Sequence, residues 1–308
     1  MKIAVLDLGT NVFNLLIANF DNHEYTILKI VKVAAKLGEG GLDNGYLSPK
    51  AFLSAEEALK KLVMVIAAED GVDGIFAVAT SAIRESKNRD EFAEFINAKF
   101  GIKIDIISGD REAELIFKGV SESMMLYNET VLVLDIGGGS NEFIIARKGE
   151  ILWKKSYPLG VARLKERFRP SDPVRMSEVD ASIKLFEEEL TEVWEECRKH
   201  NTTLLIGASG SFDTIRSILY FKDDNKSVPS RDIDLDKFEE LYKYLLISNR
   251  DERLRIDGMS PLRSDFMVLA MVFIFTVLKN TGIKQLCQSS YSLKEGVMIE
   301  KFLKYLKT

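Results

Sequence analysis

The chain has 308 residues, 46% of them apolar, with a formal net charge of −5 and a pI near 5.4. This length and apolar content suffice for two domains, each with its own core. The acidic balance excludes a chain that attracts nucleic acid or anionic membranes through its overall charge. Two cysteines, Cys197 and Cys287, form neither a disulfide framework nor a metal-binding spacing, so we expect both to pack as small apolar residues.

The hydropathy of the sequence indicates neither export nor membrane insertion. The opening MKIAVLDLG predicts a strand that leads into a turn, not a charged leader followed by an apolar core. The longest apolar run, residues 266–278, is short for a membrane span and typical of a buried helix. We therefore expect a soluble cytoplasmic protein with no membrane partner.

The pattern of apolar residues predicts two successive series of strands and helices. The first series has strands at 3–7, 13–20, 25–33, 74–79 and 103–107, and helices between Ser48 and Gly71, near 89–100 and at 110–121. The second has strands at 131–135, 142–146, 150–156, 203–206 and 283–287, and helices at 177–199, after 210, at 234–248, at 262–280 and from 293. We expect Ser177 to cap the long helix with Asp180 as its partner. Both series follow the order βββαβα, which indicates a duplicated α/β domain with a boundary in 124–130.

One motif occurs twice, once in each series. Ile3–Asn11 reads IAVLDLGTN and Val131–Asn141 reads VLVLDIGGGSN, so Asp7 and Asp135 hold matching places. Each copy predicts a buried strand that delivers a carboxylate into a tight turn, whose backbone N–H groups and hydroxyl can face a phosphate. The repeat therefore predicts a phosphate site served by both halves.

In the first copy, Asp7, Gly9, Thr10 and Asn11 would surround a phosphoryl oxygen or a hydrated Mg²⁺. The alternative is a hairpin turn whose aspartate caps the backbone.

In the second copy, Gly137, Gly138, Gly139 and Ser140 would let backbone amides approach an anion closely. Asp135 and Glu142 would flank this loop, and carboxylates of this kind suit Mg²⁺. The alternative is a flexible glycine hairpin.

Three further features carry candidate chemistry. A third strand–glycine turn, with Gly207 and Ser209, leads into a helix and would hold another phosphate or serve as a plain connection. Arg84 follows a buried strand, where it would clamp phosphate or pair with a neighbouring acid at the surface. Glu112 lies in the first turn of a helix, as a general base for water or as an acid that favours the helix dipole.

The motifs, in this order, resemble the exopolyphosphatase / guanosine pentaphosphate phosphohydrolase (Ppx/GppA) family. The matching stretches run from residue 1 to about 298 and are IAVLDLGTN, KLGEGGLDNG, AVATSAIRESKN, ISGDREAELIFKGV, VLDIGGGSNEFII, YPLGVARLKERF, LIGASGSFDTI, SPLRSD and YSLKEGV. The resemblance implies an actin-like, ribonuclease H-like fold, shared with sugar kinases and heat-shock chaperones, of two domains around a central cleft. It implies a first domain at 1–126, joined by the last helix 293–308, and a second at 127–292, in the short two-domain form.

The resemblance also implies an exopolyphosphatase that releases terminal phosphate from inorganic polyphosphate, preferring short chains. Guanosine pentaphosphate (pppGpp) is the alternative substrate of the family, and a homodimer is an expected state. Mg²⁺ is the implied cofactor, with Mn²⁺ as a substitute and K⁺ as a stimulating ion. An ATP-dependent small-molecule kinase and a non-catalytic polyphosphate or alarmone sensor are the remaining alternatives.

By position in the family motifs, Glu112 is implied as the water-activating base and Asp135 and Glu142 as the carboxylates that organise Mg²⁺. Arg84 is implied as a second catalytic residue. The residues implied to bind phosphate are Asp7, Gly9, Thr10, Asn11, Gly137, Gly138, Gly139, Ser140, Gly207 and Ser209.

The chain departs from the family pattern at four positions. Arg111 replaces an acid beside Glu112, which would favour the ionised form of Glu112 if the two side chains meet. Val12, Asn141 and Ser290 stand where serine, threonine and aspartate are common, and we expect any effect to be on the geometry of metal or substrate.

Overall fold

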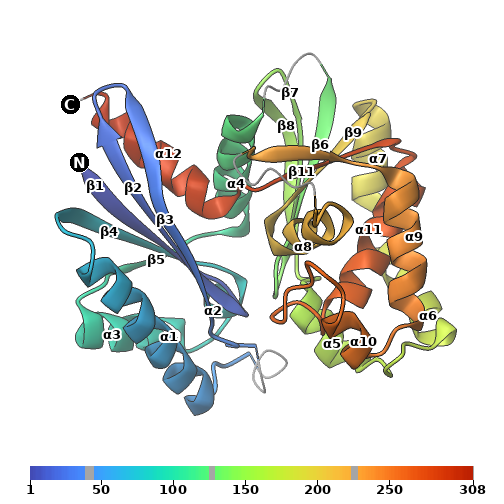
Figure 1. Ribbon diagram of the computed structural model, residues 1–308, viewed down its shortest axis with the longest axis horizontal. Coiled ribbons are helices and arrows are strands. Elements are labelled where there is room, and N and C mark those ends of the chain that lie inside the picture. Colours follow the sequence, from blue (N-terminus) through green and yellow to red (C-terminus); the bar gives the residue numbers. More distant parts are fainter. Residues whose placement is uncertain (39–44, 125–128, 223–227, 308) are drawn as a thin grey trace. The chain divides into compact units, whose positions relative to one another are not determined.

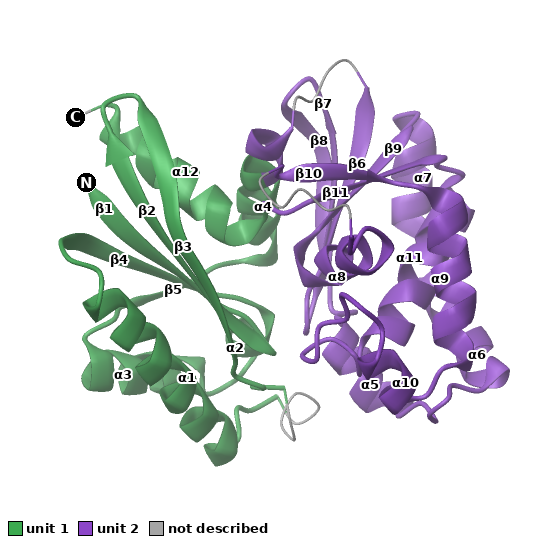
Figure 2. Cartoon of the chain, viewed as in Figure 1, with its two compact units in different colours: residues 1–119, 292–308 green, residues 120–291 purple. Residues whose placement is uncertain are grey.

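The computed structural model describes residues 1–38, 45–124, 129–222 and 228–307. Its chain divides into two compact units, which Figure 2 distinguishes by colour. Unit 1 comprises Met1–Gly119 with Ser292–Thr308, and unit 2 comprises Val120–Tyr291. The expected boundary between 126 and 127, and residues 39–44 of the expected glycine-rich loop, lie outside the described residues.

Unit 1 is built on a mixed five-stranded sheet (Figure 1). In spatial order its strands are β3 (Glu24–Ala34), β2 (Val12–Asp21), β1 (Lys2–Leu8), β4 (Val72–Ala79) and β5 (Ile104–Ile106). β1 pairs antiparallel with β2 and parallel with β4, and β4 pairs parallel with β5. Because β1, β4 and β5 run in the same direction, the residues that follow them reach the same edge of the sheet.

Five helices complete the described part of unit 1. They are α1 (Pro49–Ala67), α2 (Ser81–Arg84), α3 (Arg89–Phe100), α4 (Gly109–Ser123), whose last turn passes into unit 2, and α12 (Leu293–Tyr305). Ser48 caps α1 by accepting the Ala51 N–H at 3.2 Å. α12 packs on β1 and β2, and its Phe302 ring contacts Phe20 on β2 and Tyr25 on β3, with centroids 5.1 and 5.3 Å apart.

Glycines bring α4 and α12 into direct backbone contact. A Cβ atom added to Gly119 would overlap the carbonyl of Ser292, and one added to Gly296 would overlap the carbonyl of Leu115. Only glycine leaves this space, so the two helices are closely fixed against each other. α4 is therefore a rigid support for the residues in its first turn.

Unit 2 repeats this plan with a mixed six-stranded sheet. In spatial order its strands are β10 (Ser230–Ile233), β11 (Gln285–Ser289), β9 (Leu204–Ala208), β6 (Thr130–Ile136), β7 (Asn141–Arg147) and β8 (Glu150–Tyr157). β6, β7 and β8 are antiparallel, whereas β6, β9 and β11 are parallel. The sequence pattern does not predict β10, since only Ile233 of its four residues is buried.

The helices described in unit 2 are α5 (Val161–Phe168), α6 (Met176–Glu189), α7 (Thr191–Lys199), α8 (Ser209–Leu219), α9 (Leu235–Ile247), α10 (Arg250–Leu254) and α11 (Met267–Thr281). The prediction of one helix at 177–199 is wrong, because the buried Leu190 leaves helical geometry at φ −103° and ψ 17°. The predicted cap at Ser177 is also wrong. α6 begins after Arg175, whose N–H donates to the Glu178 carboxylate at 2.8 Å.

The core of unit 2 is organised around α11. Ten of its residues are buried, and the helix packs against α5, α6, α7 and α9. This surrounding protein accounts for its apolar sequence, and among the described residues no helix is both long and apolar enough to span a membrane. Cys197 and Cys287 are buried free thiols, as expected, and burial raises the pKa of both to about 12.

Candidate active site

The first copy of the repeated motif forms the turn between β1 and β2. Asp7 lies opposite Asn14 in the antiparallel ladder, and the Asn14 side-chain amide donates to the Asp7 carboxylate at 2.7 Å. Gly9 is required, because a Cβ atom there would lie 2.9 Å from the Val12 carbonyl. The Nδ2 atom of Asn11 is buried, and no hydrogen-bond partner for it occurs in the described part of the chain. This buried donor is suited to an anionic ligand.

Arg84 and Glu112 come together in unit 1. Arg84 ends α2 after β4, and Glu112 lies in the first turn of α4 after β5. Arg84 Nη1 donates to Glu112 Oε2 at 2.5 Å and to the Ile107 carbonyl at 3.3 Å. The exposed fractions of the two side chains are only 15% and 8%. The predicted phosphate clamp and the predicted base therefore form a largely buried ion pair.

The turn before α4 explains how Glu112 is held. The Ser108 hydroxyl accepts the Arg111 N–H at 3.2 Å, and the Ser108 carbonyl accepts the Glu112 N–H at 2.9 Å. Ser108 thus caps the helix, and the Glu112 carboxylate is directed to Arg84. The Arg111 side chain pairs with Glu300 and Glu114, and the Glu300 hydrogen bond is the main cause that raises the pKa of Arg111.

Asp135 and Glu142 stand directly opposite each other in the β6–β7 ladder. Opposite residues share one face of a sheet, with Cβ atoms about 5 Å apart. Asp135 is 6% exposed and Glu142 is 1% exposed. Glu142 Oε1 accepts hydrogen bonds from the hydroxyls of Ser140 and Ser156, each at 2.7 Å. Ser156, its neighbour across the ladder on β8, had no predicted role.

The chemistry of this carboxylate pair fits a hard divalent cation. Two like charges side by side are costly unless a cation or a proton compensates them. Within the described ranges, no group of three or more His, Cys, Asp or Glu side chains could hold a metal ion. An ion such as Mg²⁺ would therefore need water or substrate oxygens to complete its coordination, as it commonly does.

The glycine loop of the second copy is fixed by α5. Its carbonyls accept hydrogen bonds from the first turn of that helix, by the pairs Val161 to Gly137 (3.0 Å), Ala162 to Gly138 (2.9 Å) and Arg163 to Gly138 (3.2 Å). The Gly160 N–H and the Arg163 Nε both donate to the Gly139 carbonyl, at 3.2 and 3.1 Å. The N–H and C=O of one peptide unit point in opposite directions, so the amides of Gly138 and Gly139 point away from α5. This arrangement suits an anion-binding loop.

The third predicted turn lies beside the second. Asp135 on β6 is paired in parallel register with Ala208, which ends β9 between Gly207 and Ser209. Ser209 has a φ of 72°, a strained value for a residue other than glycine. The Ser211 hydroxyl is buried, without a hydrogen-bond partner in the described part of the chain. Strain and an unpartnered buried hydroxyl mark this turn as a candidate ligand site.

Arg263 lies beside this third turn. No role is predicted for it from the sequence alone. A Cβ atom added to Gly210 would overlap the Arg263 guanidinium, so the two are in contact. Burial lowers the pKa of Arg263, whereas its negative neighbours Asp213 and Asp135 act in the opposite direction. A lone arginine ahead of an apolar helix gives no local signal of this proximity.

Two of the departures from the family pattern have local explanations. Asn141 is fully buried and donates to the Leu159 carbonyl at 2.7 Å, which ties β7 to the residues before α5. The Ser290 hydroxyl is within 3.1 Å of Gln288 Nε2 and 3.5 Å of Arg216 Nη1. Nothing in the structure explains Val12.

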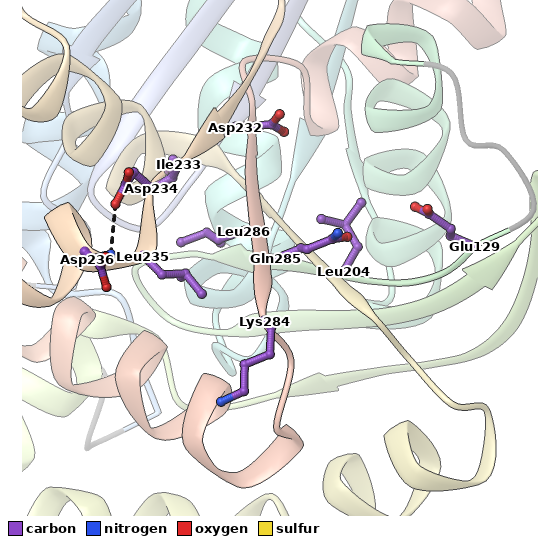
Figure 3. A pocket seen from close by; sticks show the side chains of 10 residues that line it. All are labelled: Glu129, Leu204, Asp232, Ile233, Asp234, Leu235, Asp236, Lys284, Gln285 and Leu286. Carbon is purple, nitrogen blue, oxygen red and sulfur yellow. Dashed lines mark hydrogen bonds between the residues drawn. The ribbon is translucent and has the colours of Figure 1, made fainter.

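A pocket of about 530 Å³ lies elsewhere in unit 2, at the amino ends of β9 and β11 (Figure 3). Its lining includes Glu129, Asp232 and Asp234, and Asp234 caps α9 by accepting the Asp236 and Lys237 N–H groups. None of the predicted site residues lines it. The candidate residues lie instead near the carboxyl ends of the parallel strands, where open α/β sheets build their sites.

Comparisons with known proteins give the family of the chain. Residues 16–305 match the model of the Ppx/GppA phosphatase family. The crystal structure of an exopolyphosphatase from Cytophaga hutchinsonii is 38% identical, with a TM-score of 0.95, and the match covers 99% of this chain and 98% of that one. A bifunctional 3-dehydroquinate synthase/phosphatase from Fusobacterium nucleatum is 31% identical over 96% of this chain, which spans 46% of that protein.

A solved Ppx/GppA family member from Aquifex aeolicus shares the fold, with 24% identity, a TM-score of 0.81 and coverage of 99% of this chain and 98% of its own. The α/β architecture of two mixed sheets, each opening with three antiparallel strands, confirms the predicted actin-like fold. On the match to its family model, the chain belongs to the Ppx/GppA phosphatase family.

Proposed function

We propose that this chain is an exopolyphosphatase, which uses water to release the terminal phosphate of inorganic polyphosphate. As a member of the Ppx/GppA phosphatase family, the chain is a hydrolase of phosphoanhydride bonds. The observation that carries the proposal is the largely buried pair of Arg84 and Glu112, which combines an anion-binding cation with a base. The similarity to the C. hutchinsonii exopolyphosphatase supports polyphosphate as the substrate.

The ion pair suggests how substrate binding would prepare the base. Arg84 donates to Glu112 at 2.5 Å, so its guanidinium neutralises the carboxylate. A terminal phosphate offers two oxygens that match a guanidinium better than one carboxylate oxygen does. When Arg84 turns to the phosphate, Glu112 loses its cationic neighbour and accepts a proton more readily. Activation of the base would then follow from occupation of the site.

The chemical step is an in-line displacement. The oxygen of a water molecule forms a bond to the terminal phosphorus, and the bond from that phosphorus to its bridging oxygen breaks. The bridging oxygen leaves with the bonding electrons on the shortened polyphosphate, and Glu112 takes the proton of the water. Catalysis would come mainly from positioning and charge neutralisation, and loss of such a base costs on the order of 10²–10⁴-fold.

Each unit, taken by itself, has turns suited to phosphate oxygens. In unit 1, the buried Nδ2 of Asn11 and the hydroxyl of Thr10 are the proposed donors. In unit 2, the amides of the glycine loop and the Arg263 guanidinium are the proposed partners of phosphate oxygens. The remaining proposed contacts are with Gly9, Ser140, Gly207 and Ser209. Asp7, already bonded to Asn14, would orient the first turn.

Asp135 and Glu142 would hold Mg²⁺, or Mn²⁺ in its place. The support is their opposed register, their burial and the hardness of carboxylate oxygens. The bound ion would supply positive charge to phosphate oxygens. Ser140 and Ser156 would keep the Glu142 carboxylate in place through their hydrogen bonds.

The test is phosphate release, measured by malachite green over polyphosphates of graded length, pppGpp and ATP. We expect release from polyphosphate, fastest on short chains, and a loss of about 10²–10⁴-fold in kcat for Glu112→Gln. Glu192→Gln is a matched control, because this carboxylate lies on the surface of unit 2 with Lys155.

Three outcomes would contradict the proposal. Preference for pppGpp would assign the other activity of the family, and phosphorylation of an acceptor by ATP would indicate a kinase. Tight polyphosphate binding without turnover, across Mg²⁺, Mn²⁺ and K⁺, would indicate a sensor.

A further inference from the structure

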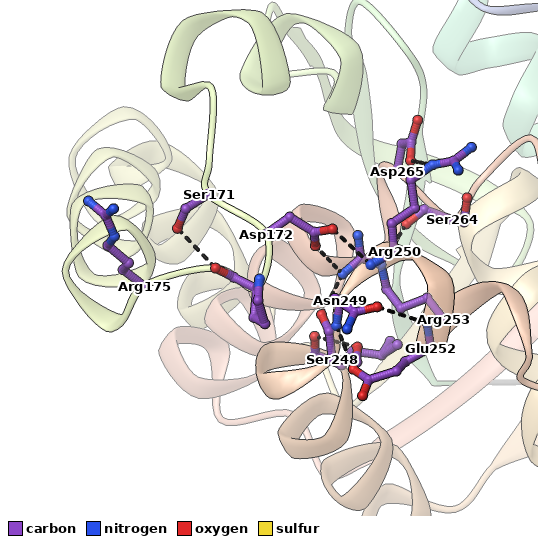
Figure 4. Close-up of polar contacts among 12 residues, drawn as sticks. Ser171, Asp172, Arg175, Ser248, Asn249, Arg250, Glu252, Arg253, Ser264 and Asp265 are labelled. Carbon is purple, nitrogen blue, oxygen red and sulfur yellow. Dashed lines mark hydrogen bonds and ion pairs between the residues drawn. The ribbon is translucent and has the colours of Figure 1, made fainter.

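The 260–265 segment, which carries Arg263, is anchored by a buried arginine outside the candidate site. Arg253 lies on α10 and is 5% exposed. Figure 4 shows its polar contacts. Its Nε donates to the Ser264 carbonyl at 3.0 Å, and its Nη1 donates to the Ser248 carbonyl at 2.6 Å and to Asp172 Oδ1 at 2.9 Å. One side chain thus joins Ser248 just before α10, the 260–265 segment and Asp172, which is 81 positions away in the sequence.

The short helix α10 is built to present this side chain. Asn249 accepts the Glu252 N–H at 3.0 Å, and Glu252 accepts the Asn249 N–H at 2.8 Å, so the first turn is capped in both directions. The other oxygen of Asp172 accepts the Arg250 N–H at 2.8 Å. Asp172 therefore fixes both the backbone of α10 and the guanidinium of Arg253.

A second set of contacts holds the neighbouring residue of the segment. Asp265 accepts from Arg250 Nε at 2.7 Å and lies 3.4 Å from Lys165 Nζ on α5. The pKa of Asp265 is lowered by these two cations, against the opposing effect of burial. Since α5 also binds the glycine loop, the segment and that loop share one support.

We propose that Arg253 is a positioning residue for Arg263. The carbonyl that Arg253 holds belongs to the residue directly after Arg263, so the backbone cannot shift without breaking that hydrogen bond. The Arg263 guanidinium is thereby kept against Gly210 and near Asp135. This role rests on the proposed function, in which Arg263 binds phosphate oxygens.

A burial argument favours positioning over a purely stabilising role. A buried arginine is costly unless it is fully paired, and apolar residues of similar volume commonly stabilise as well or better. Here the planar guanidinium serves acceptors in three segments at once, which an apolar side chain could not align. Displacement of a binding group by about 1 Å can cost up to roughly 10²-fold in rate.

The first test compares Arg253→Lys with Val193→Ala, a core truncation on α7 of the same unit. Lysine keeps the charge but loses the planar array of donors. We expect the KM for tripolyphosphate to rise about tenfold in Arg253→Lys, with a smaller change in kcat. Val193→Ala should lower the thermal midpoint at unchanged KM. Equal KM in Arg253→Lys and wild type would overturn the proposal.

The second test is a double-mutant cycle with Arg263→Ala. If Arg253 acts through Arg263, then Arg253→Lys should change kcat/KM by less than about twofold in the Arg263→Ala background. Independent, multiplicative losses would instead show a structural role and overturn the proposal. Should Arg253→Lys fail to fold, Asp172→Asn removes the paired charge from a side chain that is 43% exposed.

The affinity of the same four variants for tripolyphosphate is also measured, by calorimetry in the absence of divalent ions. If the wild-type chain releases no phosphate from any polyphosphate, the proposed function fails, yet binding still reports the coupling of the two arginines. Coupled losses in affinity support positioning, and independent losses contradict it.

Discussion

The two copies of the strand–aspartate–turn motif differ in the residue opposite the aspartate. In unit 1, Asp7 faces Asn14, whose amide donates to it at 2.7 Å. In unit 2, the equivalent ladder position opposite Asp135 is Glu142. The first copy therefore supplies a hydrogen-bond donor for its own carboxylate, whereas the second places two carboxylates side by side. This difference between the ladder partners fits the proposal that the carboxylates of the second copy hold a cation.

The two turns also share a pattern of backbone hydrogen bonds that the repeated sequence does not predict. In unit 1, the Thr10 and Asn11 carbonyls accept from the backbone of residues 35–37, at 2.8–3.0 Å. In unit 2, the carbonyls of Gly137–Gly139 accept from residues 160–163. Both turns thus have their carbonyls engaged by the chain that follows the third strand. Amides on the other side of these peptides are then available to face a ligand.

The largest expected effect comes from leaving a single carboxylate in the second copy, as the first copy has. Asp135→Asn leaves the shape of the side chain but removes one of the two opposed charges. We predict a loss of about 10²–10³-fold in kcat, with a rise in the Mg²⁺ concentration needed for half-maximal activity. The measurement is phosphate release over a Mg²⁺ titration. An unchanged Mg²⁺ requirement would contradict the assignment of the carboxylate pair to the metal.

The next largest effect concerns the contact between the glycine loop and the start of α5. A Cβ atom at Gly160 would overlap the backbone of Gly138 and Gly139, so Gly160→Ala must push the loop away from α5. We predict a loss of about 10–10²-fold in kcat/KM and of about 1–3 kcal/mol in the free energy of unfolding.

Gly149→Ala is the matched control for this substitution. Gly149 has a φ of 79° and nothing within 4 Å of an added Cβ. The control should lose stability through backbone strain while keeping its kcat/KM. Equal kcat/KM losses in the two variants would refute a specific role for the contact with α5.

The duplicated architecture could be predicted because its signals are local. Apolar runs mark β1 and β6, and the aspartate and glycine after each run mark the turns. The residues that lie opposite the site carboxylates could be predicted only in part. Asn14 and Ser156 are polar residues within strands, and nothing local marks them. Their importance depends on register, which places each beside a carboxylate.

Local sequence patterns could not predict the ion pair of Arg84 and Glu112 or the contacts of Arg253 and Arg263. Arg84 and Glu112 were each predicted, yet their contact depends on the pairing of β4 with β5. Arg263 and Arg253 had no predicted role, since tertiary contacts alone bring them to Gly210 and Ser264. The break at Leu190 was missed because a buried leucine is equally compatible with a continuous helix.

The reverse exchange in unit 1 should have a smaller effect. Asn14→Asp would place two carboxylates opposite each other where the chain now has a charged acceptor and its donor. We predict a loss of about 1–3 kcal/mol in the free energy of unfolding at pH 7, and about tenfold in kcat/KM. The stability loss should fade as the pH falls towards 4, because one carboxyl then takes up a proton.

Denaturant unfolding of wild type and Asn14→Asp between pH 4 and 8 measures this dependence. Asn14→Leu, which removes the donor without adding charge, is the control and should recover less at low pH, because it loses only the hydrogen bond to the ionised Asp7. Recovery of equal size in both variants would show that charge repulsion is not the cause.

The smallest effect concerns the support of Glu142. Ser156→Ala removes one of the two hydroxyls that donate to Glu142 Oε1, while Ser140 still donates at 2.7 Å. Loss of one such hydrogen bond costs about 0.5–1.5 kcal/mol. We therefore predict a two- to fivefold weaker apparent Mg²⁺ affinity with nearly unchanged maximal activity, measured by Mg²⁺ titration of phosphate release. The same loss without Mg²⁺ dependence would mean that Ser156 only stabilises β8. A loss confined to low Mg²⁺ would instead show that the second copy depends on hydroxyl donors to hold a carboxylate for the ion, as the first depends on an amide.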